Sequence, residues 1–115
     1  MSDDPITFHL VAGEYYRDSR SDEPYTPEAY ASDGFIHCTD GAENVAAVAN
    51  RYYTADRRMY IALLIEKALV VPEIRYEDAD AIYPHIYGPL NRDAIVGVVP
   101  VLRNADGTFV PPAVS

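Results

Sequence analysis

Stretches in which apolar and polar residues alternate, or in which apolar residues follow one another, predict a chain dominated by β-strands. Residues 6–11 alternate, with Ile, Phe and Leu on one face and Thr, His and Val on the other. Residues 59–65 are nearly all apolar, which is typical of a central strand buried on both faces. Shorter strands are predicted at residues 34–39 and 74–77.

A helical repeat of apolar residues predicts one main helix. Apolar side chains recur here every three or four positions, at Val45, Val48, Ala49 and Tyr52. Asp40 and Glu43 stand at the spacing of a capping box, in which two side chains bond the first backbone amides of a helix. We therefore predict a helix over residues 41–53 with Asp40 as its N-cap.

Residues 83–90 read Tyr-Pro-His-Ile-Tyr-Gly-Pro-Leu and predict a strand that ends at the Gly-Pro pair. The alternation places Tyr83, His85 and Tyr87 on one face of this strand and Ile86 on the other. A polar, aromatic face with a histidine at its centre is unusual on a core strand. This stretch is therefore the main functional clue in the sequence.

The C-terminal part of the chain predicts an edge strand and a hairpin. Residues 94–102 are rich in β-branched residues, and Pro100 near their end indicates an edge or a bulge. The Asn-Ala-Asp-Gly sequence at residues 104–107 is a strong turn signal, so a terminal hairpin is expected.

Residues 14–33 are polar and tyrosine-rich, and they predict a flexible flap with short helical pieces. Residues 14–20 suit one or two helical turns, and Thr26 followed by Pro27 is typical of a helix start. Strands with one main helix indicate an α+β fold. A length of 115 residues suits a single domain over residues 1–115.

Charge and composition narrow the classes of partner. The formal net charge of -9 argues against DNA, because nucleic-acid surfaces need a basic footprint, but it permits a small anionic ligand in a locally basic pocket. No apolar run approaches a membrane span, and the acidic N-terminus lacks the pattern of a signal peptide. The single cysteine, Cys38, agrees with a reducing compartment, so we expect a cytoplasmic protein without a membrane partner. The oligomeric state is left open.

Three histidines, His9, His37 and His85, lie on predicted strands beside core positions. Buried polar rings need hydrogen-bond partners. Each ring is therefore either a neutral, hydrogen-bonded structural residue or part of a pocket shared by all three. The trio could in principle bind zinc with a water as fourth ligand, but the long spacings and the absence of paired ligands favour no metal site. Alternation points Cys38 away from His37, which favours a small buried side chain over a Cys-His catalytic pair.

Charged residues provide weaker candidates. Glu77 precedes the 83–90 stretch and could act as an acid or base, although the acidic run at residues 77–80 is more typical of a solvated turn. Arg92 follows the same stretch and could anchor an anion at the pocket rim. The chain has neither a glycine-rich phosphate loop nor a Gly-x-Ser-x-Gly motif.

Three motifs together resemble the bacterial domain-of-unknown-function family 952. They are Phe8-His9, the Gly-Phe-Ile-His-Cys-Thr of residues 34–39 and the aromatic stretch of residues 83–90. The resemblance extends over residues 6–102. It implies an ADP-ribosyltransferase-like fold, a split, curved sheet with one main helix and short helical pieces, in which an NAD-type ligand lies in the cleft between the two halves.

The resemblance also implies roles for the histidines. His9 would contact a ribose, His37 would pack on nicotinamide or hold a phosphate, and His85 would stand at or near the catalytic glutamate of the protein-modifying transferases. A histidine there lacks the carboxylate that would orient a ribose hydroxyl and stabilise an oxocarbenium-like transition state. Thr39 keeps the hydroxyl of the serine that is usual at its position.

We therefore expect a pocket with His85, His37 and His9 as catalytic residues and Tyr83, Tyr87, Thr39 and Arg92 as ligand-binding residues. The first hypothesis is an enzyme that acts on NAD or on a substrate bearing ADP-ribose or a 2'-phosphate, with His85 as general acid/base. NAD would then be a substrate, and no resident cofactor is expected. The alternatives are a non-enzymatic module that binds a small nucleotide-like ligand, and a partner-binding domain with structural histidines.

Overall fold

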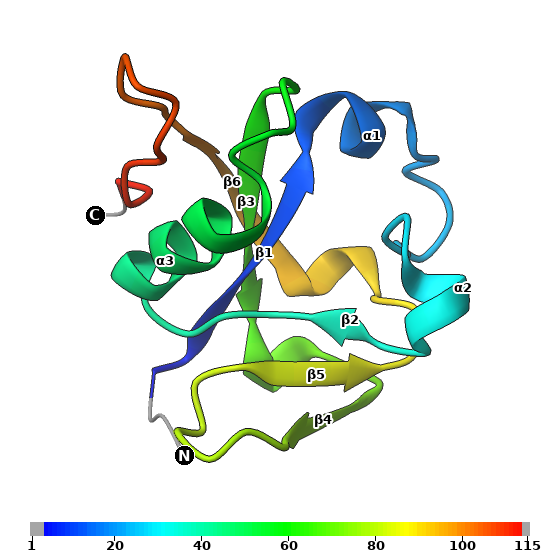
Figure 1. Cartoon of the computed structure of the whole chain (residues 1–115). Coiled ribbons are helices and arrows are strands. Elements are labelled where there is room, and N and C mark those ends of the chain that lie inside the picture. The colour runs from blue at the N-terminus through cyan, green and yellow to red at the C-terminus, as the bar shows by residue number, and fades with distance from the viewer. Residues whose placement is uncertain (1–3, 114–115) are drawn as a thin grey trace.

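Two three-stranded antiparallel sheets form the framework of the chain (Figure 1). The structure is a computed structural model and describes residues 4–113. The large sheet has the order β1-β3-β6 and contains β1 (Ile6–Ala12), β3 (Tyr60–Glu66) and β6 (Ile95–Val101). The small sheet has the order β2-β5-β4 and contains β2 (Ile36–His37), β5 (Pro84–Tyr87) and β4 (Glu73–Tyr76). The helices are α1 (Gly13–Asp18), α2 (Tyr30–Asp33), α3 (Ala42–Tyr52) and the short 3-10 turns η1 (Lys67–Leu69) and η2 (Arg92–Ala94). The protein is thus an α+β protein with few helices.

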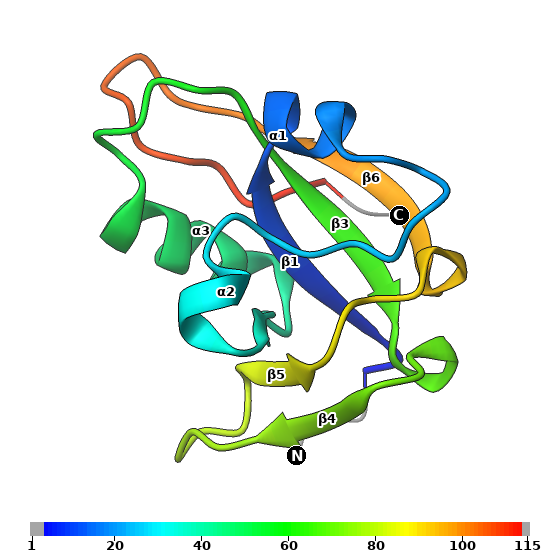
Figure 2. The same cartoon turned by 90° about the vertical axis from the view of Figure 1, so that its right-hand side faces the viewer.

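The β1 and β3 strands of the large sheet are covered on both faces, because a different layer packs on each side (Figure 2). On one side α3 packs its apolar face, with Val45 and Ala49, against Phe8 and Ala62 of the sheet. On the other side Leu63 packs with the small sheet and the flap in a second cluster, whose further buried members include Tyr25, Ile36, Ile86 and Leu90. This double cover explains why β3 is almost continuously apolar.

The small sheet has one buried face and one polar face, as the alternation along the sequence predicts. Ile36 of β2 is paired with Ile86 of β5, and both are fully buried. The neighbouring pair in the same register is His37 and His85. Since alternate residues of a strand point to opposite faces, burying the isoleucines directs both histidines outward.

A single bridge joins the two sheets near the start of the chain. The Phe8 amide donates to the Thr39 carbonyl at 2.9 Å, and the Thr39 amide donates to the Phe8 carbonyl at 2.7 Å. The end of the short strand β2 therefore runs beside β1. As a result His9 lies close to the backbone of His37.

The predicted strands and main helix are confirmed, with β3 central and β6 at an edge of the large sheet. Asp40 is not the cap of α3, however, because Gly41 occupies that position and makes no side-chain cap bond. The Asp40 carboxylate is instead buried, and its Oδ2 atom accepts hydrogen bonds from Lys67 Nζ at 3.1 Å and Tyr76 Oη at 2.6 Å. The turn at residues 104–107 forms, but its hairpin is reduced to one bridge between Arg103 and Phe109.

Contacts of Tyr25 and Arg92 help to attach the flap of residues 14–33 to the body of the protein. Tyr25 is completely buried, and its backbone exchanges two hydrogen bonds with Leu90 at 2.8 and 2.9 Å. Arg92 donates to the carbonyl oxygens of Glu23 at 2.8 Å and Arg20 at 2.6 Å. The first helical piece is confirmed as α1, whereas the helix start predicted at Thr26 is wrong because α2 begins at Tyr30. Flexibility of the flap stays a prediction.

Replacing Arg92 by alanine is expected to loosen the flap and lower the free energy of unfolding by about 1–3 kcal/mol, because several hydrogen bonds to a charged group are lost. The rate of tryptic cleavage after Arg17 and Arg20 should rise at the same time. Urea unfolding and limited proteolysis measure the two effects, with Arg57→Ala as an exposed control. An unchanged cleavage rate would show that the guanidinium does not hold the segment.

Within residues 4–113, no helix combines the length and the apolar character needed to cross a membrane.

Candidate functional site

A groove of two adjoining cavities runs between α3, the flap and the two sheets. The His9 cavity has a volume of about 570 Å³, and residues that line it include His9, Pro27, Glu28, Tyr53, Asp56 and Arg58. The His85 cavity has a volume of about 410 Å³, and residues that line it include Arg51, Asp78, Tyr83 and His85. Both cavities are also lined by His37, Thr39, Val48 and Tyr52. The two cavities adjoin along these shared residues, and we refer to the pair as the groove.

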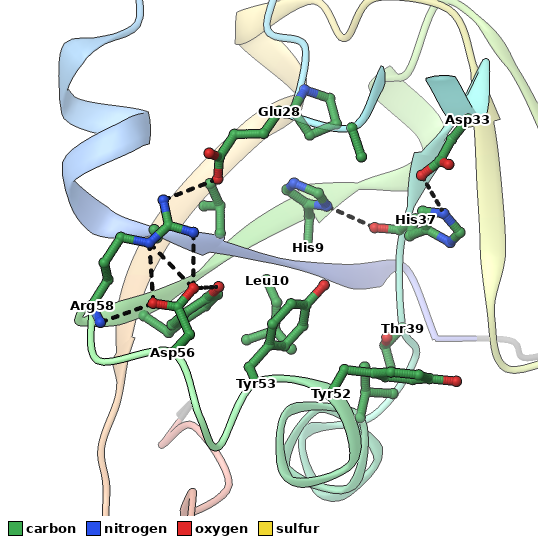
Figure 3. Close-up of a pocket in the computed structure, with 16 residues that line it drawn as sticks. His9, Leu10, Glu28, Asp33, His37, Thr39, Tyr52, Tyr53, Asp56 and Arg58 are labelled. Atoms are coloured by element: carbon green, nitrogen blue, oxygen red, sulfur yellow. Dashed lines mark hydrogen bonds and ion pairs between the residues drawn. The ribbon is translucent and has the colours of Figure 1, made fainter. Parts of the chain in front are cut away.

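His9 stands at the wall of the groove, where its ring bonds the backbone of His37 (Figure 3). A second bond, to Tyr25, engages the other ring nitrogen. Its Nδ1 atom lies 2.7 Å from the His37 carbonyl oxygen, and because a carbonyl can only accept, Nδ1 carries the hydrogen. Its Nε2 atom lies 2.9 Å from Tyr25 Oη and accepts from that hydroxyl. Burial lowers the His9 pKa from 6.5 to about 4, so the ring is neutral near pH 7.

These bonds make His9 a positioning residue for β2 and the flap. The ring links the backbone of His37 to the buried Tyr25, whose pKa is raised mainly by burial. A neutral ring with both nitrogens bonded is not available as a base without breaking a buried hydrogen bond. Of the two roles considered for the histidines, this geometry favours the structural, hydrogen-bonded role for His9.

His37 and His85 face each other across neighbouring strands and differ in exposure. Their ring centroids are 5.2 Å apart in an edge-to-face arrangement, and their side chains are 59% and 20% exposed. Each ring pairs with one carboxylate: His37 Nε2 lies 3.1 Å from Asp33, and His85 Nδ1 lies 3.1 Å from Glu77. Phe35 stacks on His85 with its centroid 4.1 Å away, which restricts the ring's orientation.

Glu77 is an ionised carboxylate that orients His85. It accepts one hydrogen bond from the Tyr87 hydroxyl and one from His85, and these bonds lower its pKa. The neighbouring Asp78 accepts from the amides of Ile82 and Tyr83, which shapes the turn before β5. The interpretation of residues 77–80 as a solvated turn therefore suits Asp78, but it does not account for the hydrogen bond between Glu77 and His85. Only the pairing of β4 with β5 brings Glu77 beside His85.

The remaining predicted site residues divide into two groups. Thr39 lines both cavities, and Tyr83 lines the His85 cavity. Tyr87 lies outside both linings and supports Glu77 instead, while the Arg75 guanidinium stacks 4.4 Å over its ring. Arg92 is also outside both linings, since its guanidinium is committed to flap carbonyls, and the anion-anchor interpretation does not match this placement.

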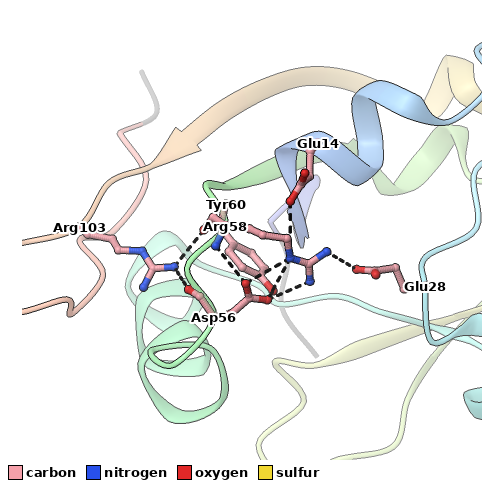
Figure 4. A network of polar contacts seen from close by, with 6 residues as sticks. All are labelled: Glu14, Glu28, Asp56, Arg58, Tyr60 and Arg103. Atoms are coloured by element: carbon pink, nitrogen blue, oxygen red, sulfur yellow. Dashed lines mark hydrogen bonds and ion pairs between the residues drawn. The ribbon is translucent and has the colours of Figure 1, made fainter.

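Two further arginines, Arg51 and Arg58, line the groove. Arg58 in the His9 cavity pairs with Asp56 at 2.9 Å and with Glu28 at 3.1 Å, and the hydrogen bonds from Arg58 hold the Asp56 pKa well below its usual range (Figure 4). Arg103 donates to the Arg58 carbonyl at 3.0 Å and so ties down this loop. Arg51 lies over the Tyr52 ring at 5.5 Å and lines the His85 cavity. No local motif marks either arginine.

The three histidines do not form one ligand set. His9 lines one cavity, His85 lines the other, and His37 lines both. Across residues 4–113, no group of three or more histidine, cysteine, aspartate or glutamate side chains is arranged to hold a metal ion.

The chain is a small α+β protein with two antiparallel sheets and a histidine-lined groove. The family model described as "Protein of unknown function (DUF952)" matches residues 10–98, and the chain belongs to this family. No curated protein matches the chain.

Solved structures of one bacterial protein share the fold. The crystal structure of protein CC0527 from Caulobacter crescentus is 17% identical to this chain, with a TM-score of 0.75, over 91% of this chain and 93% of that one. The solution NMR structure of CC0527 is also 17% identical, with a TM-score of 0.70 over 90% of each chain. At this identity the likeness shows the fold alone.

Proposed function

We propose that the groove binds a nucleotide-like ligand of the NAD, ADP-ribose or 2'-phosphate type, and that His85 is the general acid/base of a reaction on it. The observation that carries this proposal is the pairing of Glu77 with His85 at the wall of the His85 cavity. Because Glu77 accepts the Nδ1 hydrogen, the Nε2 atom of a neutral His85 keeps its lone pair for a substrate proton.

The lining of the groove suits such a ligand. Tyr52, Tyr53 and Tyr83 supply aromatic faces and edges for a planar ring. Arg51 supplies a cation for a phosphate group, and the Thr39 hydroxyl can bond a ribose or phosphate oxygen. The combined cavities lie within the size range of small-molecule sites.

The arrangement of the sheets supports the same proposal. Two three-stranded sheets with a groove beside their junction are what the ADP-ribosyltransferase-like resemblance implies. We infer that this is the split sheet of that superfamily. The ligand would then lie along α3, with His37 at its middle.

A binding module without turnover is the second candidate. The observation in its favour is that Glu77 is engaged by His85 and Tyr87, so its carboxylate is not directed at a ligand. This module would keep the groove and Arg51 but carry out no reaction.

Titration with ADP-ribose is expected to shift the ring NMR signals of His37 and His85 and to leave those of His9 nearly unchanged. Both ring nitrogens of His9 are already bonded within the protein, whereas His37 and His85 line the His85 cavity together with Arg51. Arg51→Ala should weaken binding by about tenfold, as expected for the loss of one charge-assisted hydrogen bond. Arg17→Ala on the exposed side of α1 is the matched control.

Histidine signals that stay unchanged at millimolar NAD, ADP-ribose and a 2'-phosphorylated dinucleotide would contradict the proposal. Shifts without turnover of any of these ligands would favour the binding module.

A further inference from the structure

The His85 cavity combines four side chains that suit one phosphate ester. His37 and His85 provide two titratable rings, Thr39 provides a hydroxyl and Arg51 provides a guanidinium, and all four line this cavity. Guanidinium and hydroxyl groups donate to the non-bridging oxygens of a phosphate. Two histidines near one phosphorus atom can take a proton from the attacking oxygen and give a proton to the leaving oxygen.

Each ring is held by a carboxylate at one nitrogen, so the opposite nitrogen is the one that can meet a substrate. Asp33 holds His37 at Nε2, which directs its chemistry to Nδ1. Glu77 holds His85 at Nδ1, which directs its chemistry to Nε2. The ring centroids are 5.2 Å apart, so groups bonded to one phosphorus atom can reach both rings.

Charge and size favour a mononucleotide as the substrate of the His85 cavity. A net charge of -9 opposes a long nucleic acid. A volume of about 410 Å³ lies near the lower end of ligand cavities, and Tyr83 offers a ring on which one base can stack. A nucleoside 2',3'-cyclic phosphate is a phosphodiester of that size.

We propose that the His85 cavity hydrolyses a nucleoside 2',3'-cyclic phosphate with His85 as general base and His37 as general acid. The proposal rests on the nucleotide groove of the proposed function and adds the reaction. His85 is the more enclosed ring and activates a water held in the cavity, while the more exposed His37 can be reprotonated from solvent.

The proposed step moves one proton in and one proton out. His85 Nε2 takes a proton from water as the water oxygen forms its bond to phosphorus. The bond between phosphorus and the ribose 2'-oxygen breaks, and protonated His37 gives its Nδ1 proton to that oxygen. The product is a nucleoside 3'-phosphate, and exchange with solvent restores the two rings.

Two substrates with different leaving groups separate the roles of base and acid. The probes are adenosine 2',3'-cyclic phosphate and thymidine 5'-(4-nitrophenyl) phosphate, and the wild-type chain is expected to hydrolyse both. His85→Gln should lose about 10²–10⁴-fold in rate on both substrates. His37→Gln should lose as much on the cyclic phosphate but keep its rate on the nitrophenyl ester within about tenfold, because nitrophenolate leaves without a proton.

Glu77→Gln tests the positioning of His85 without removing a catalytic ring. Its kcat on the cyclic phosphate should fall with little change in KM, because Glu77 lies behind His85. Glu73→Gln removes a carboxylate at the start of β4, the strand just before Glu77. Glu73 pairs with Arg75 and is outside both linings, so this change should leave both constants unchanged. Equal thermal unfolding of the variants and the wild type shows that the differences are not due to folding.

Two results would overturn the acid–base pair. The first is a wild-type chain that hydrolyses neither substrate. The second is a His37→Gln variant whose hydrolysis rate falls by the same factor on both substrates. Shifts of the His37 and His85 signals with ADP-ribose in the same samples would leave the proposed function standing. Hydrolysis without any shift would reject the NAD-type ligand instead.

Discussion

Replacing Lys67 by methionine is expected to lower the free energy of unfolding by about 3–5 kcal/mol, because it leaves a buried carboxylate without its cation. Lys67 is the one lysine of the chain, and its side chain is 16% exposed, against 4% for that of Asp40. Tyr76 would still donate to Asp40, but the other carboxylate oxygen, Oδ1, already has no hydrogen-bond partner among residues 4–113. A lone buried charge with one remaining donor is costly.

Urea unfolding at pH 7 measures this effect, and two further variants control it. Arg75→Met breaks an ion pair to Glu73 that is 2.9 Å long but at least half exposed, so its effect should stay below about 1 kcal/mol. Asp40→Asn combined with Lys67→Met should recover much of the loss, because a neutral amide can still accept from Tyr76. Equal effects of Lys67→Met and Arg75→Met would argue against a buried pair.

The free energy of unfolding is expected to fall by about 3 kcal/mol as the pH is lowered from 6.5 to about 4, because of His9. The folded protein keeps His9 neutral because burial lowers its pKa from 6.5 to about 4. As the pH falls through this window, the unfolded chain takes up a proton that the folded chain does not. This contribution is therefore fully present above pH 6.5, declines as the pH falls, and is exhausted below about pH 4.

His9→Gln provides the comparison for this prediction. A glutamine amide can donate to the His37 carbonyl and accept from Tyr25, yet it has no charge to gain in this range. The difference in unfolding free energy between the wild type and His9→Gln should shrink or reverse as the pH falls from 7 to 4. Urea titrations at half-unit pH steps measure it, and parallel curves for the two proteins would show that His9 is not kept neutral by burial.

Local pattern was enough to predict the main elements of the fold. The apolar run at residues 59–65 predicted the central strand β3, because burial on both faces leaves few polar positions. The helical repeat predicted α3 to within one residue at each end. The alternation at residues 83–90 placed His85 and Tyr87 opposite Ile86, which is the burial pattern of β5.

Errors and omissions arose where a side chain bonds a residue distant in sequence. Asp40 had the spacing of a helix cap, but a tertiary ion pair with Lys67 takes its carboxylate. Arg92 appeared close to the pocket because of its position after the aromatic stretch, yet its donors reach carbonyls some 70 residues earlier in the chain. Arg51 reaches the groove through the orientation of α3, and Glu77 reaches His85 through the pairing of β4 with β5, and local sequence encodes neither.

The sequence by itself determined the α+β class, the alternation that directs His37 and His85 outward, and the motifs that relate the chain to its family, because these depend on periodicity and residue identity. The tertiary structure decided that His9 is bonded at both nitrogens and that carboxylates back the other two rings. It did so because the Phe8–Thr39 bridge and the β4–β5 register join segments whose spacing along the chain carries no information about their contact.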